Sequence, residues 1–122
     1  TKIQRIANSY APLIINGEPE GDVLALSWGG TYGAVTSAVR TLQAEGFKVS
    51  SVHLRHLNPL PNDLGDTLKR FKQVIIPELN SGQLALLIRA KYLIDAVPLN
   101  KMMGRPFKVA EIREAILNLI PS

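Results

Sequence analysis

One apolar segment, which ends in a glycine-rich turn and continues as an amphipathic helix, constrains the fold of this chain more than any other feature. Residues Asp22–Trp28 are largely apolar, which predicts a buried parallel strand. The glycines of the turn are Gly29, Gly30 and Gly33. We expect them to let the backbone turn sharply and to bring the next helix close to the sheet. Apolar residues recur at helical spacing in Tyr32–Glu45, and Gly46 is placed to end that helix.

The rest of the chain repeats this unit. Further strands are predicted at Lys48–Leu54, at Gln73–Ile76 with Pro77 at its end, and more weakly at Val97–Lys101. Strands that alternate with helices predict an α/β fold with a largely parallel sheet and helices on both faces.

Three helices follow from the same periodicity. Asn62 or Asp63 is suited to cap a short helix that turns Leu64, Leu68 and Phe71 inward, although Gly65 weakens that prediction. A second helix, capped by Asn80 or Ser81, should bury Leu84, Leu87, Ile88 and Tyr92. The last helix, Val109–Ile120, should bury Ile112, Ala115, Ile116 and Leu119.

The first 21 residues differ from the remainder. Lys2–Tyr10 has helical spacing without a cap before it, so we expect a linker helix that continues from an upstream domain. Leu13–Ile15 could form a short edge strand. We therefore divide the chain into a linker segment, 1–21, and a domain, 22–122.

Composition excludes several classes of protein. The 122 residues are 46% hydrophobic, which suits one domain with a core, and no apolar run is long enough to span a membrane. The chain has no cysteine, which excludes disulfides, thiolate zinc sites and cysteine-ligated clusters within it and fits a cytoplasmic location. The net charge is only +4, and the basic stretches lack aromatic partners, so we expect no nucleic-acid surface.

Ligand sites in open α/β sheets form beyond the carboxyl ends of the strands. Four polar loops should meet there: 27–32, 53–58, 78–83, and the loop that holds Lys101 and Arg105. The alternative is that these side chains are polar only because loops face water.

Known catalytic motifs do not fit these loops. The glycine turn fails the G-x-G-x-x-G spacing, no P-loop lysine follows, and Ser27 lacks the G-x-S-x-G context. His53 and His56 lack a nearby carboxylate for a metal set. Glu78 is the one carboxylate that we single out, at a strand end where we expect an exposed glutamate beside a helix N-terminus. The residues alone therefore predict a fold and a polar edge without a self-sufficient active site.

Four runs of sequence resemble one family. They are 27–34 (SWGGTYGA), 53–61 (HLRHLNPLP), 77–85 (PELNSGQLA) and 100–107 (NKMMGRPF). Together, in this order and spacing, they resemble the C-terminal domain of the α subunit of 2-oxoacid:ferredoxin oxidoreductases, most closely the 2-oxoglutarate branch. Gly30 stands where the family pattern has a small hydroxyl residue, and Arg105 also departs from it.

The resemblance implies a transketolase C-terminal-like domain: a three-layer α/β/α sandwich with a mostly parallel, mixed sheet of about five strands. It also implies a holoenzyme that uses thiamine diphosphate, magnesium and a [4Fe–4S] cluster, forms acyl-coenzyme A from a 2-oxoacid and reduces ferredoxin. In that setting this domain binds no cofactor alone and is not catalytic. Its implied partners are the upstream domains, the thiamine diphosphate-binding β subunit and ferredoxin, with no nucleic acid and no membrane.

We expect the polar edge to shape a subunit interface or to touch a ligand. The candidate residues are Trp28, Thr31, Tyr32, Arg55, His56, Asn58, Glu78, Asn80, Gln83, Lys101 and Arg105. Two alternatives stay open. One is a stand-alone module that binds a small molecule or a protein, and the other is a small hydrolase that uses Ser81 or Ser27.

Overall fold

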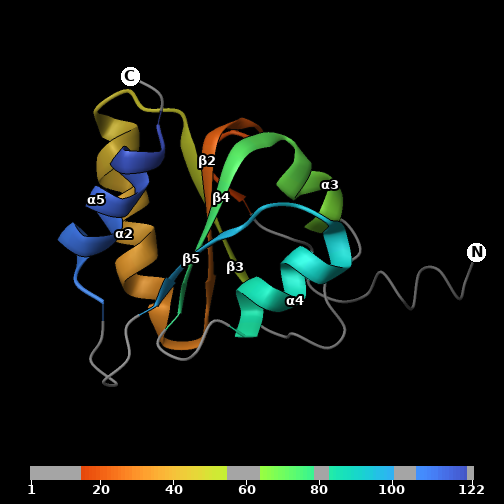
Figure 1. The fold of residues 1–122 in the computed structure, drawn as a ribbon. Helices are drawn as coiled ribbons and strands as arrows, with labels where there is room; N and C mark the ends of the chain where they lie inside the picture. Colours follow the sequence, from red (N-terminus) through yellow and green to blue (C-terminus); the bar gives the residue numbers. More distant parts are fainter. Residues whose placement is uncertain (1–14, 55–63, 79–82, 101–106, 121–122) are drawn as a thin grey trace, which may run out of the picture.

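The computed structural model describes residues 15–54, 64–78, 83–100 and 107–120. Strands and helices alternate along most of this chain (Figure 1). The strands are β1 (Ile15–Asn16), β2 (Gly21–Trp28), β3 (Val49–Leu54), β4 (Phe71–Glu78) and β5 (Val97–Asn100). The helices are the 3-10 turn η1 (Gly29–Thr31), α2 (Tyr32–Ala44), α3 (Leu64–Lys69), α4 (Gln83–Tyr92) and α5 (Val109–Leu119).

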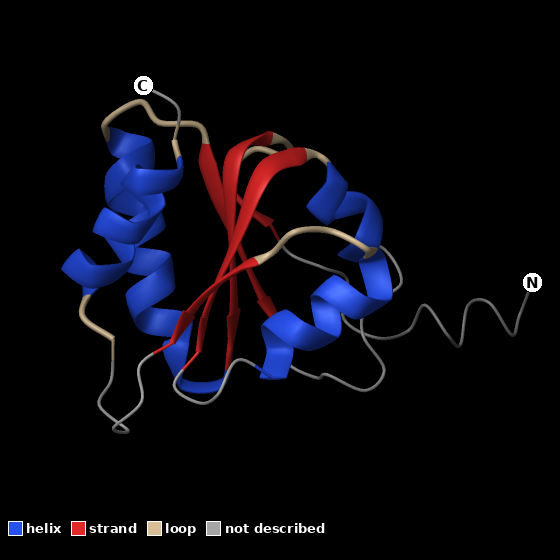
Figure 2. Ribbon diagram, viewed as in Figure 1, coloured by secondary structure: helices blue, strands red, loops and turns tan. Residues whose placement is uncertain are grey.

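The sheet has the order β1-β3-β2-β4-β5. All its pairings are parallel except the one between β1 and β3, in which Ile15 lies opposite Val52. Helices α2 and α5 cover one face, and α3 and α4 cover the other (Figure 2). The predicted three-layer sandwich with a mixed sheet is therefore confirmed. The edge strand expected at Leu13–Ile15 is present at Ile15–Asn16, while residues 13 and 14 lie outside the described part.

Alternation along β2 divides the core in two. Val23 and Ala25 pack with residues of α2 and α5, whereas Leu24 and Leu26 pack with residues of α3 and α4. Successive side chains of a strand point to opposite faces, so an almost wholly apolar strand supplies both layers.

Glycines lie at both ends of α2. Gly46 ends the helix as predicted, whereas Gly29 and Gly33 at its start do not have the predicted packing role. Gly46 has φ +93°, and the amides of Gly46 and Phe47 donate to the carbonyls of Gln43 and Leu42, which is the Schellman arrangement. At Gly29, with φ +66°, the turn itself requires glycine. However, a Cβ at Gly29 or Gly33 would meet no atom within 4 Å, so the expected role of these two glycines in close helix–sheet packing is wrong.

Other expectations need correction. Phe71 is buried, but as the first residue of β4 rather than as part of α3. Pro77 lies inside β4 opposite Leu99, one residue before the strand ends. Leu87 is 39% exposed, because Leu84, Ala85 and Ile88 already fill the inward face of α4. The predicted helix at Lys2–Tyr10 and the cap at Asn62 or Asp63 lie outside the described residues.

Candidate functional site

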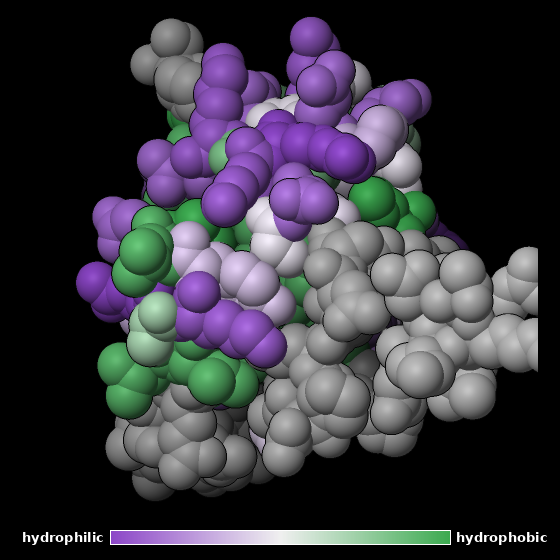
Figure 3. Space-filling view, turned by 90° about the vertical axis from the view of Figure 1, so that its right-hand side faces the viewer, coloured by the Kyte–Doolittle hydropathy of each residue, from purple (hydrophilic) through white to green (hydrophobic). Residues whose placement is uncertain are grey.

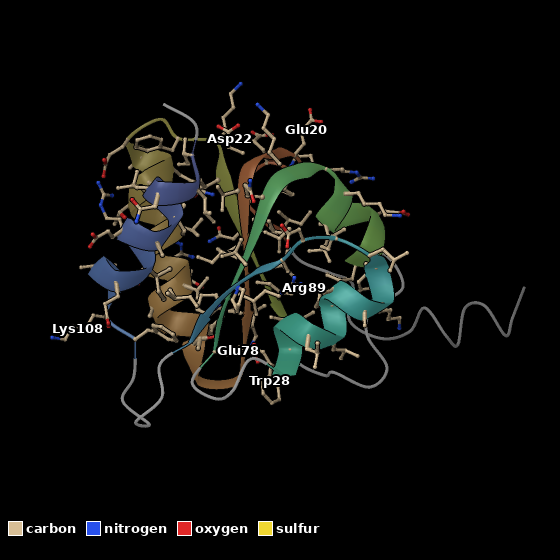
Figure 4. The ribbon with its side chains drawn as sticks, viewed as in Figure 1. Glu20, Asp22, Trp28, Glu78, Arg89 and Lys108 are labelled. Atoms are coloured by element: carbon tan, nitrogen blue, oxygen red, sulfur yellow. The ribbon has the colours of Figure 1, made fainter. Side chains whose placement is uncertain are left out.

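Strands β2, β3 and β4 end at one edge of the sheet, which is where ligand sites form in open α/β folds. From β2 the chain turns through η1 into α2, and after β4 it continues as α4 on the opposite face (Figure 1). Trp28 and Glu78 lie at this edge, at the opposite end of the sheet from Glu20 and Asp22 (Figure 4). The carboxyl ends of the neighbouring strands β2 and β4 therefore form the topological switch point of the sheet.

A small cluster lies on the α2 side of this edge. The register of the parallel pair places Ser27 opposite His53. Ser27 Oγ lies 2.8 Å from His53 Nδ1 and 3.3 Å from the carbonyl oxygen of Val52. The ring of Tyr32 meets the imidazole edge-on, with 4.7 Å between the ring centroids. Because Ser27 is 1% exposed, its hydroxyl fixes the two strand ends and is not an accessible nucleophile.

The turn after β2 closes on its own backbone. Thr31 Oγ1 accepts a hydrogen bond from the amide of Trp28 at 3.2 Å and donates one to the carbonyl of the same residue at 3.1 Å. Thr31 is buried, whereas Trp28 and Tyr32 are 37% and 51% exposed. The turn therefore uses its hydroxyl internally and presents two aromatic side chains outward.

Glu78 is buried, which corrects the expectation of an exposed glutamate. Only 5% of the residue is accessible, and its two carboxylate oxygens accept the backbone amides of Leu84 and Ala85 at 2.8 and 3.1 Å. The first amides of a helix have no partner within the helix, and a carboxylate also suits the positive end of the helix dipole. Glu78 therefore caps α4 from the preceding strand.

The structure brings part of the predicted set together. Trp28 and Glu78 end β2 and β4 at the carboxyl edge, Thr31 and Tyr32 lie in the turn and helix that follow β2, and Gln83 is the first residue of α4. The remaining candidates lie outside the described residues. They are Arg55, His56, Asn58, Asn80, Lys101 and Arg105.

Ser27 and His53 were not among the predicted interface or ligand-contact residues, and Ser27 was considered only for the hydrolase alternative, although the two side chains are in contact at this edge. The signal that could have found them is register. Ser27 is the next-to-last residue of β2 and His53 the next-to-last of β3, so a parallel pairing that ends evenly sets them side by side.

No group of three or more metal-ligating side chains occurs within residues 15–54, 64–78, 83–100 and 107–120. In the same ranges no helix is long and apolar enough to cross a membrane.

No protein-family model matches the chain. Among curated proteins, it is 41% identical over 110 residues to the 2-oxoglutarate oxidoreductase subunit KorA of Mycobacterium tuberculosis, an alignment that covers 88% of this chain and 17% of that protein. The structure of a 2-oxoglutarate:ferredoxin oxidoreductase from Magnetococcus marinus matches 98% of this chain and 22% of its own, with a TM-score of 0.88 and 34% identity. This chain is homologous to a segment of 2-oxoacid:ferredoxin oxidoreductase α subunits.

The fold of this chain is also similar to that of a more distant protein. A split-gene transketolase chain matches 87% of this chain with a TM-score of 0.66, and the match covers 41% of that chain. The identity is 18%, so this likeness concerns the fold alone. The predicted transketolase C-terminal-like fold and the resemblance to the α subunits are thus confirmed. The chain spans only 17% of the mycobacterial relative.

Proposed function

We propose that this chain serves as the transketolase C-terminal-like domain of the α subunit of a 2-oxoacid:ferredoxin oxidoreductase of the 2-oxoglutarate type. The observation that carries the proposal is the 41% identity to a 2-oxoglutarate oxidoreductase subunit along 88% of the chain. The similar Magnetococcus marinus enzyme, whose structure contains bound 2-oxoglutarate, coenzyme A and succinyl-CoA, supports the same branch. The linker at 1–21 and the domain at 22–122 remain predictions of this proposal.

The internal bonding of the carboxyl edge supports a structural and interface role for the domain. The polar groups of three residues at this edge bond within the domain. Ser27 joins two strand ends, Thr31 bonds within a turn, and Glu78 caps the start of a helix. Among the described candidates, the exposed side chains are the aromatic residues Trp28 and Tyr32, which are common at protein interfaces.

The iron–sulfur cluster of the proposed holoenzyme does not fit this chain. A [4Fe–4S] cluster needs cysteine thiolates, and the chain has none. We therefore assign the cluster to another part of the assembly, and we propose that thiamine diphosphate and magnesium are also bound outside this chain.

The overall reaction of such an assembly would release carbon dioxide from a 2-oxoacid, transfer the acyl group to coenzyme A and pass the electrons to ferredoxin. The proposed partners are the upstream domains of the same subunit, the thiamine diphosphate-binding β subunit and ferredoxin. A cytoplasmic location also stays a prediction, which fractionation of the source cells would test.

Four polar residues of the loops that the sequence predicts at the carboxyl edge are the proposed contacts to coenzyme A or substrate. They are Arg55, His56, Asn80 and Arg105. Alanine at each position should raise the KM of the assembled enzyme for one of these ligands while kcat changes less. Unchanged Michaelis constants in all of them would remove this part of the proposal.

The mass of the native polypeptide in its source cells tests the proposed function directly. A much longer chain that co-purifies with a thiamine diphosphate and iron–sulfur partner is the expected result. A free chain of 13.4 kDa without such a partner would contradict the proposal and favour a stand-alone binding module instead.

A further inference from the structure

Helix α4 exposes two large apolar side chains, whereas α2 and α5 each expose one, Tyr32 and Val109, at their first residue. The exposed positions of α2 include Ser37, Arg40 and Thr41, as expected for an amphipathic helix on the surface of a domain. In contrast, α4 exposes Leu86 and Leu87, and Leu93 directly after the helix is 87% exposed. The opposite side of α4 fills the core with Leu84, Ala85 and Ile88, so this helix carries apolar side chains on both sides.

The exposed apolar residues form one surface. Leu86 and Ala90 are four residues apart on one side of α4, Leu87 borders them, and the exposed Leu93 follows directly after the end of the helix. We call these four residues the outer α4 face. Figure 3 looks onto the side of the molecule that carries α3 and α4 and shows apolar side chains at that surface among polar ones.

Leu93 is unfavourable in the domain for two reasons. Its φ of +56° lies in the left-handed region, which costs free energy for a residue with a Cβ and is usually left to glycine or asparagine after a helix. Its amide bonds to the carbonyl of Arg89 at 3.0 Å, so the backbone is held in this conformation. The side chain gains nothing in return from burial within the domain.

We infer that the outer α4 face docks against a part of the α subunit that lies outside these 122 residues. The inference rests on the proposed function, in which this chain is one domain of a longer polypeptide. The length of the relatives supports it, because the chain accounts for only 17% of the mycobacterial subunit.

The size of the surface favours an attached partner over a second copy of the chain. A specific interface between separate proteins uses about 20–30 residues on each side, and this face has far fewer. Attachment through the same polypeptide gives an effective concentration on the order of millimolar, so a small apolar contact is sufficient.

The surrounding charges indicate the chemistry of the docking surface. Arg89 and Lys91 flank the outer α4 face and are exposed. Arg89 Nη2 lies 3.6 Å from Asp95, in an ion pair that faces solvent, and Lys91 Nζ lies 5.8 Å from the centroid of the Tyr92 ring. A partner with an aliphatic centre and carboxylates at its margin would complement this arrangement.

Amide hydrogen exchange of residues 83–92 tests the docking. We expect exchange at least tenfold slower in the assembled enzyme than in the 122-residue chain alone. Leu86→Gln should restore the fast exchange in the assembly, whereas Val109→Gln should not. Val109 is an exposed apolar residue at the start of α5, on the opposite face of the sheet, so it is the matched control.

Leu93→Gly gives a second test, because it should stabilise the isolated chain and weaken the docking contact in the assembly. In the isolated chain it should raise the midpoint of thermal unfolding by several degrees, because glycine relieves the left-handed backbone. In the assembly it should speed the exchange of α4, because the docking contact is lost.

Equal exchange of α4 in the isolated chain and in the assembly would overturn the inference, even if the native polypeptide proves to be long. A dimer of the isolated chain that Leu86→Gln disrupts would also overturn it and assign the face to a second copy. A native polypeptide of only 13.4 kDa would instead contradict both the proposed function and this inference.

Discussion

Gly65 of α3 faces the ring of Tyr92 at the end of α4, and a Cβ at Gly65 would lie 2.8 Å from two of the ring carbons. No ordinary van der Waals contact is that short, so the two helices pack this closely only because residue 65 has no side chain. The same glycine made the helix doubtful in the sequence.

Gly65→Ala should therefore destabilise the protein by roughly 1 kcal/mol, although alanine is the better helix former by about the same amount. In a Tyr92→Ala background, the same substitution should be stabilising. Urea unfolding of the two single variants and the double variant gives the coupling energy. A destabilisation that is the same in both backgrounds would show that the ring of Tyr92 is not the cause.

The cap of α4 by Glu78 predicts a cost that is local to that helix. Glu78→Ala removes both acceptors of the Leu84 and Ala85 amides inside the protein, so we expect a loss of about 1–3 kcal/mol. Denaturant unfolding measures the loss, and amide exchange should show the greatest increase in the first turn of α4. Glu114→Ala, at an exposed position of α5, should have little effect. A small, evenly distributed change in Glu78→Ala would contradict the capping role.

The ion pair between Arg113 and Glu45 predicts how stability depends on pH. Arg113 joins α5 to α2 through Glu45, with one N–O distance of 2.6 Å, and it also donates to Thr41 Oγ1 at 3.2 Å. The hydrogen bond from Arg113 lowers the pKa of Glu45 from its ordinary value of 4.5. A carboxyl group with a lowered pKa in the folded state stabilises the protein above its ordinary pKa, and the stabilisation is lost as the pH falls through the folded-state value.

Urea unfolding at a series of pH values, from about 6 down to about 3, would measure this dependence. Glu45→Gln should remove its contribution from the pH profile, and Arg113→Gln should do the same, because either variant breaks the pair. A wild-type profile that both variants retain would assign the acid sensitivity to other carboxyl groups.

The two glycines around the η1 turn predict opposite effects of alanine. Gly29 has φ +66°, so Gly29→Ala should cost about 1 kcal/mol. Gly33 lies in α2 with open space around its Cα, so Gly33→Ala should stabilise by about 0.5–1 kcal/mol. Thermal unfolding of the two variants checks the pair. A loss of stability in Gly33→Ala would restore a packing role for that glycine.

The contact between Ser27 and His53 predicts a structural cost. Ser27→Ala should lower the free energy of unfolding by about 1–2 kcal/mol, because buried polar groups lose a partner. Ser37→Ala, at an exposed position of α2, should change it little. Ester hydrolysis by the wild-type chain that Ser27→Ala abolishes would instead support the hydrolase alternative.

Within the described residues, the sequence was sufficient for the order and type of the strands and α-helices. Apolar runs such as Val23–Leu26 are typical of strands buried between two layers, and apolar residues at steps of three and four, as at Ile112, Ala115 and Ile116, indicate a helix with one buried face. Glycine at position 46 adopts the left-handed conformation that ends the helix at little cost in free energy. These features depend on local backbone geometry and on burial, both of which act at short range along the chain.

Only the tertiary structure decided which side chains meet. Glu78 and Leu87 are the clearest examples, since a glutamate at a strand end was expected to face water and a leucine at helical spacing was expected to be buried. The position of α4 against β4 reverses both, because it buries the carboxylate under the first amides of the helix and leaves Leu87 outside the filled core. Contacts of this kind depend on how two elements are placed in space, and periodicity within one element carries no information about that placement.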